Sequence, residues 1–214
     1  MARTHGLVCL LVCLASLATS QRSSAATEPP PIPTTPDVQI AAVWKVQQLN
    51  FVYHSDNVVY GCGQLLQKLK VILVSVGASD RIELRSYHCD ERAGLARFEV
   101  RIESPAAATQ ENIQALATHT SRDELVARVN GERLPSAEDV QVFQAEWRTV
   151  SFARNRRMAL HAADCELVEQ VQRQLLPRLS VQIVRDNVLC SPAFGNISPP
   201  RLTVSALFKI EEET

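Results

Sequence analysis

The chain has 214 residues, of which 46% are hydrophobic and 21% charged, and its formal net charge is −1. This composition is typical of a globular protein and excludes a fibrous or extended disordered one. Because the chain has no basic excess, it lacks the electrostatic signature of non-specific nucleic-acid binding, and no nucleic-acid partner is expected.

Residues 1–26 have the pattern of a secretory signal peptide. Arg3 supplies the positive charge, and residues 7–18 form an apolar run that is too short to span a bilayer as a helix. Small residues offer two cleavage points, after Ser20 or after Ala26. Residues 27–36 are rich in proline and predict an extended linker. We therefore expect a periplasmic or secreted protein with no transmembrane segment once the signal is removed.

Residues 37–104 predict a β-α-β-β unit. Apolar residues alternate up to Tyr53, as in a half-buried strand. From Cys62 they recur at helical spacing as far as Val76, and Gly77 stands where a helix ends in a left-handed residue. Alternating patterns then predict two more strands, over residues 81–89 and 97–103.

The connector, residues 105–138, predicts one short helix. Residues 121–124 (SRDE) fit a capping box before an apolar stretch, and Gly131 stands just past its end. Residues 139–214 then predict a second β-α-β-β unit, with a strand at 147–153, a helix from Cys165 and strands at 181–190 and 201–210. Asp164 is the expected N-cap of that helix.

The two units share one spacing. Trp44 precedes Cys62 by as many residues as Trp147 precedes Cys165, and a basic residue follows each tryptophan. We interpret this as an internal duplication. The predicted fold is α+β, with helices packed on antiparallel sheet and one disulfide in each unit; the sequence leaves open whether the units share a sheet.

The cysteine pairing follows from geometry. A helix from Cys62 to residue 76 advances roughly 22 Å at about 1.5 Å per residue, and the following strand returns over a similar length at about 3.3 Å per residue. Cys89 therefore lies near Cys62, and by the same reasoning Cys190 lies near Cys165. Of the six cysteines, Cys9 and Cys13 lie in the predicted signal peptide and are expected to leave with it. The four that remain in an exported chain favour two structural disulfides. Pairing between the units, a metal-binding pair or a reactive pair are the alternatives, the last because a helix N-terminus favours a thiolate.

Other candidate residues carry weaker signals. His88 and His161 lie near cysteines and supply the metal-site alternative, since imidazole and thiolate suit zinc or copper. A Cys165–His161 nucleophile requires a free thiol, which a disulfide removes. We interpret Trp44 and Trp147 as core anchors in preference to ligand-stacking residues. The basic run 154–157 (RNRR) is interpreted as a solvated turn in preference to an anion site.

Three segments resemble a group of uncharacterised exported proteins from proteobacteria: residues 59–62 (VYGC) before a leucine-rich helix, residues 76–78 (VGA) and residues 164–170 (DCELVEQ). The resemblance covers residues 37–210 and implies a bacterial, periplasmic or secreted protein. It brings no activity, ligand or catalytic residue. The leading hypothesis is a non-enzymatic binding or envelope-associated module without a cofactor, whose envelope or protein partner is unidentified. A metal- or thiol-handling protein is the alternative, and an unknown hydrolase or transferase comes third.

Overall fold

The computed structural model describes residues 39–92, 94–190 and 198–211, so the predicted signal peptide and linker lie outside the described residues. None of the helices in these ranges is long and apolar enough to cross a membrane. The strands and α-helices, in chain order, are β1 Gln39–His54, α1 Cys62–Ser75, β2 Glu83–Asp90, β3 Leu95–Ala107, α2 Gln110–Ala117, α3 Ser121–Asn130, β4 Val142–Ser151, α4 Cys165–Gln174, β5 Val181–Asn187 and β6 Arg201–Lys209.

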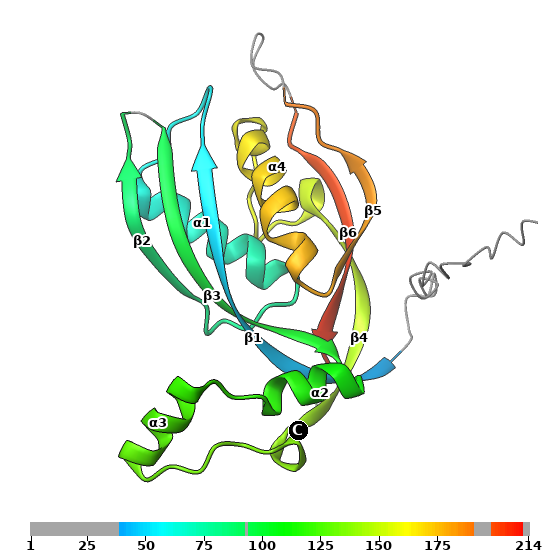
Figure 1. The fold of residues 1–214 in the computed structure, drawn as a ribbon. Helices are drawn as coiled ribbons and strands as arrows, with labels where there is room; N and C mark the ends of the chain where they lie inside the picture. The colour runs from blue at the N-terminus through cyan, green and yellow to red at the C-terminus, as the bar shows by residue number, and fades with distance from the viewer. Residues whose placement is uncertain (1–38, 93, 191–197, 212–214) are drawn as a thin grey trace, which may run out of the picture. The chain divides into compact units, whose positions relative to one another are not determined.

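The six strands form one antiparallel sheet in the order β2-β3-β1-β4-β6-β5 (Figure 1). The two predicted units therefore share a sheet, and they meet where β1 pairs with β4 between Gln39 and Val43. The strand order is symmetric about this junction, because β3 flanks β1 as β6 flanks β4. The predicted α+β class, antiparallel sheet and one disulfide per half are confirmed. The internal duplication stays a prediction.

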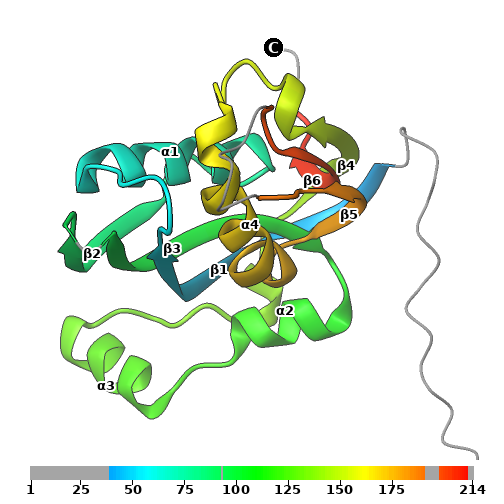
Figure 2. The same cartoon turned by 90° about the horizontal axis from the view of Figure 1, so that it is seen from above.

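A single large core lies on one face of the sheet. Both α1 and α4 pack on this face, and Leu69 of α1 and Val171 of α4 are fully buried against inward residues of β1, β3 and β6. Figure 2 shows α2 and α3 on the other side of β1 and β3 from α1. At about 25 cal/mol per Å² of apolar surface, this burial is the main force that holds the two halves together.

Side chains of α4 form hydrogen bonds with a stretch of the β1 edge that pairs with no described strand. Beyond Val43, the edge of β1 that faces β4 has no strand partner. There the side-chain amide of Gln170 bonds both the N–H and the C=O of His54, and Gln174 does the same for Val52. Two glutamines one helical turn apart thus satisfy backbone groups that a strand would otherwise pair. These hydrogen bonds attach α4 of the second half to β1 of the first half.

Gly77 lies at a second close contact between the halves. It follows α1 with a φ of +95°, which glycine adopts at no steric cost and which agrees with the predicted helix end. A Cβ atom at this position would lie 2.2 Å from the backbone oxygen of Leu207 in β6. Glycine therefore both ends α1 and lets it approach the second half.

The connector differs from its prediction in two respects. It holds two helices, α2 and α3, where one was expected. The capping box of α3 uses Thr120 and Asp123, with Thr120 in an extended conformation just before the helix. Since the helical conformation begins at Ser121, the residue that serves as the N-cap is Thr120, one position earlier than the pattern indicated.

Candidate functional site

The four cysteines that follow the predicted signal peptide form the two predicted disulfides. Cys62 pairs with Cys89 at a Cα–Cα distance of 6.2 Å, and Cys165 pairs with Cys190 at 5.6 Å. Each bond ties the start of a helix to the end of the strand that returns beside it. These four cysteines therefore present no free thiol while the bonds are intact.

The predicted metal-site histidines lie in different halves. His88 is exposed in edge strand β2, and His161 is exposed in the turn before α4. Within the described residues, the structure brings together no group of three or more histidine, cysteine, aspartate or glutamate side chains that suits a metal ion. The backbone N–H of His161 donates to Asp164 at 2.7 Å, which gives this segment a structural role.

The two tryptophans lie near the junction of β1 and β4 and outside the large core. Trp147 packs against a small cluster of Ala42, Ala145 and Leu207. The Trp44 ring lies 5.0 Å from the Phe143 ring, which packs against the same cluster. Both tryptophans are half-buried, so each keeps part of its ring accessible.

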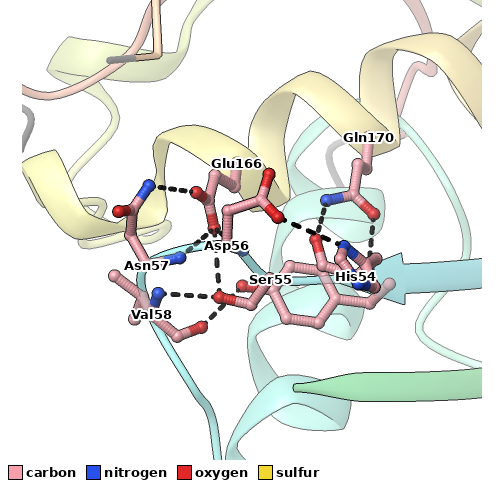
Figure 3. Close-up of polar contacts among 8 residues, drawn as sticks. His54, Ser55, Asp56, Asn57, Val58, Glu166 and Gln170 are labelled. Carbon is pink, nitrogen blue, oxygen red and sulfur yellow. Dashed lines mark hydrogen bonds and ion pairs between the residues drawn. The ribbon is translucent and has the colours of Figure 1, made fainter. Parts of the chain in front are cut away.

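The first turn of α4 clamps the loop that follows β1, as Figure 3 shows. The buried carboxylate of Glu166 accepts hydrogen bonds from the Ser55 hydroxyl at 3.1 Å, the Asp56 N–H at 3.3 Å and the Asn57 side-chain amide at 2.6 Å. Ser55 in turn accepts from the Val58 N–H at 2.7 Å. No short-range sequence pattern indicates this contact, because the partners of Glu166 lie more than a hundred residues away in the chain.

Asp164 forms a second buried contact between the halves. The Lys68 ammonium of α1 lies 2.9 Å from one carboxylate oxygen and 3.0 Å from the other, and the Tyr60 hydroxyl donates to the same carboxylate. Asp164 occupies the predicted N-cap position of α4, but its side chain makes no capping bond to that helix. Its oxygens instead accept hydrogen bonds from Tyr60, Lys68 and the His161 N–H. A hydrogen bond from a charged group such as the Lys68 ammonium stabilises a buried carboxylate more than a bond from a neutral backbone N–H of α4 would.

The protonation states in this cluster follow from these contacts. Burial alone raises the pKa of Asp164, but the Tyr60 hydroxyl, the His161 N–H and the Lys68 charge outweigh burial and hold that pKa below its ordinary value. Burial raises the pKa of Tyr53 to about 12 and that of Tyr60 further still. The tyrosines are thus neutral donors beside an ionised carboxylate. With every group committed to a partner, the cluster joins the two halves.

The outer face of β4, β6 and β5 carries a second group of polar side chains. A groove of about 590 Å³ lies over β4, β6 and β5, and we call it the arginine groove; it is lined by Thr149, Ser151, Ala153, Arg154, Arg185, Asn187, Arg201 and Thr203. Val150, Leu202 and Val204 alternate with Ser151 and Thr203 and belong to the core. Because successive strand residues face opposite sides, the groove lies on the sheet face away from α1 and α4.

Strand register brings the groove residues together. Thr203 of β6 lies opposite Ser151 of β4 on one side and opposite Arg185 of β5 on the other. Asn187 lies opposite Arg201. In β5 a register shift between Ile183 and Arg185 changes the strand's phase, so Arg185 faces outward with Thr203 while Ile183 lies opposite a core position. Such bulges re-aim side chains at sheet edges.

The guanidinium groups of the arginine groove have no charged partner in the described part of the chain. Arg154, Arg185 and Arg201 are exposed, and no ion pair or side-chain hydrogen bond joins their guanidinium groups to a described residue. Among the described residues that line the groove there is no aspartate or glutamate. Arg154 belongs to the run interpreted as a solvated turn; it lines the groove because it directly follows β4.

The matching face of the first half is neutralised. There Arg101 lies 3.4 Å and Arg85 lies 3.5 Å from the Glu83 carboxylate, and Glu99 stands opposite Arg85 in the register. Thr203 stands opposite Arg185 at the corresponding place in the second half. A hydroxyl thus replaces a carboxylate, which leaves the cations of the second half available to an external anion.

Comparison with known proteins gives no functional precedent. No protein-family model, curated protein or solved structure matches the chain. The functional reading therefore depends on the geometry and charge of the arginine groove.

Proposed function

We propose that this chain is an exported, disulfide-braced, non-enzymatic binding protein that holds an anionic ligand in the arginine groove. The observation that carries the proposal is a set of three guanidinium groups in one groove that have, among the described residues, neither an ion-pair partner nor a carboxylate beside them. Arginine presents several N–H donors in a planar fork that suits carboxylate, sulfate and phosphate oxygens.

The rest of the molecule supports a rigid binding surface. Most groove residues come from three hydrogen-bonded strands, whose inward side chains belong to the core. Ala153 and Arg154 come from the 3-10 helix Phe152–Arg154 that follows β4. Two disulfides fit an oxidising compartment, so we place the protein in the periplasm or outside the cell. The thiol- or metal-handling alternative would instead need a cysteine released from its disulfide, for which no contact in the described residues gives a reason.

The proposal predicts that groove arginines dominate anion binding. We expect a variant with Arg154→Gln, Arg185→Gln and Arg201→Gln to bind tripolyphosphate at least about 30-fold more weakly than the unmodified protein at low salt. Three charge-assisted contacts are lost together in that variant. Isothermal titration calorimetry over a series of salt concentrations measures the affinity, and the slope with salt should become shallower in the variant.

A matched control removes the same charge from the other half. Arg85→Gln, Arg97→Gln and Arg101→Gln change the outer face of β2 and β3, where Glu83 neutralises two of the three arginines. At about 0.15 M salt this variant should bind within about twofold of the unmodified protein, because charges more than about 8 Å from the ligand are then largely screened. Equal weakening by both triple variants would mean that net charge and not the groove governs binding, and the proposal would fail.

A further inference from the structure

We infer that the ligand of the arginine groove is an acidic saccharide, a sugar that carries sulfate or phosphate esters. This inference rests on the proposed function and adds the chemical class of the ligand. Its starting point is that hydroxyl and amide groups lie between the guanidinium groups of the groove. Ser151, Thr203 and Arg185 form one row across three strands, and Asn187 lies beside Arg201 in the next.

The donor and acceptor properties of these side chains fit a sugar better than a bare anion. An inorganic oxyanion needs donors alone, and the guanidinium groups supply them. Serine and threonine hydroxyls and the asparagine amide both donate and accept hydrogen bonds. A sugar hydroxyl requires such two-way partners. The alternation of cations with hydroxyls therefore matches a ring that carries both anionic esters and free hydroxyls.

The size and lining of the groove argue against two other classes of anionic ligand, lipids and single-stranded nucleic acids. Its volume of about 590 Å³ falls within the range of roughly 300–1,000 Å³ for organic ligands. Among the described lining residues only Ala153 is apolar, so they offer an acyl chain little apolar surface. None of these described residues is aromatic, and aromatic rings supply much of single-strand nucleic-acid binding.

Trp147 adds a flat apolar surface at one end of the groove. It lies on β4 two positions before Thr149, and residues two apart on a strand face the same side of the sheet. The ring packs on the small cluster with one part and remains partly exposed. A half-exposed indole beside polar groups can stack on the C–H face of a sugar ring that extends beyond the cations. Because it could also stack on a base, the choice of a sugar rests on the hydroxyl row and not on Trp147.

The test separates the sugar from its charge. Thr203→Val and Ser151→Ala together remove the hydroxyl row and leave all three arginines. Calorimetry is run on the disulfide-bonded protein with sucrose octasulfate, glucose 1,6-bisphosphate, tripolyphosphate and hexathymidylate as probes. We expect the hydroxyl variant to weaken binding of at least one sugar ester about tenfold and to leave tripolyphosphate within about twofold. Which sugar ester responds distinguishes a sulfated ligand from a phosphorylated one.

The other outcomes of these titrations contradict either the saccharide inference or the proposed function, and they can be told apart. If the hydroxyl variant affects neither sugar ester, or affects tripolyphosphate equally, while the arginine triple variant abolishes binding, the saccharide inference is wrong and the anion groove stands. If hexathymidylate binds more tightly than both sugar esters, the ligand is a nucleic acid and the inference is again wrong. If the arginine triple variant binds every probe as well as the unmodified protein, the proposed function itself is wrong. Circular dichroism confirms that each variant is folded.

Discussion

Replacing Asp164 by alanine should lower the free energy of unfolding by about 3–5 kcal/mol, the usual cost of removing one partner of a buried ion pair. The carboxylate of Asp164 is 2% exposed and the Lys68 side chain 18%. Without this carboxylate, the Lys68 ammonium and the Tyr60 hydroxyl remain inside the protein without their partner, and one contact between the halves is lost. Urea unfolding at neutral pH measures the change.

A control on the same helix distinguishes a buried from an exposed carboxylate. Glu169 of α4 lies 3.9 Å from Arg173 in a pair whose side chains are 41% and 64% exposed. Glu169→Ala should cost at most about 0.5 kcal/mol, as exposed helix pairs do. Similar losses for Asp164→Ala and Glu169→Ala would contradict the assignment of Asp164 as the buried link.

The stabilising effect of Asp164 should also depend on pH. Its pKa in the folded protein lies below the ordinary value, so its contribution is fully present above the unfolded pKa of about 3.9. That contribution is lost as the pH falls through the lower folded pKa. The stability difference between the unmodified protein and Asp164→Asn should therefore be constant above about pH 5 and shrink under strongly acidic conditions. A difference that does not change as the pH falls would show that this carboxylate is not ionised in the folded protein.

Removing either disulfide should cost about 3–4 kcal/mol, because the bonds close loops of similar length, with sequence separations of 27 and 25 residues. The paired variants are Cys62→Ala with Cys89→Ala and Cys165→Ala with Cys190→Ala. The second pair should also weaken tripolyphosphate binding several-fold. Cys190 holds the chain just after β5, where Asn187 and Arg185 line the groove.

The first pair serves as the control for that second effect. Cys62 and Cys89 brace the first half, so their removal should lower stability and leave anion affinity within about twofold. Urea unfolding gives the stability of both paired variants, and calorimetry at a temperature where both are folded gives the affinity. A loss of affinity that is equal in the two variants would mean that the groove depends on global stability and not on the anchoring of β5.

The features predictable from the sequence were those encoded by short-range periodicity. Alternating and helical patterns located the main strands and helices, and their lengths implied that Cys89 returns to Cys62 and Cys190 to Cys165. The capping residue of α3 was misplaced by one position because Thr120 and Ser121 have the same capping chemistry, and conformation alone decides between them. The N-cap position of Asp164 was predictable. Its side-chain partners, Tyr60 and Lys68, were not, because they come from the other half.

The arginine groove could not be predicted, because it depends on register. Regular alternation places Ile183 and Arg185 on the same face, and the shift between them is what turns Arg185 toward Thr203. Arg154 and Arg201 are 47 positions apart in the sequence and meet only because β4 and β6 are neighbours in the sheet. The one available signal was the outward set Arg201, Thr203 and Ser205 in the last predicted strand, which is polar and lacks an acid.

The central claim is that anions bind to the outer face of β4, β6 and β5 and not to the equivalent face of the first half. Titration of ¹⁵N-labelled protein with sucrose octasulfate, followed by backbone amide chemical shifts, tests this directly. The account predicts that the largest saturable shifts fall on Ser151, Arg185, Asn187 and Thr203 and their neighbours. Shifts centred on Arg85 and Arg101, or small shifts spread over both faces without saturation, would contradict it.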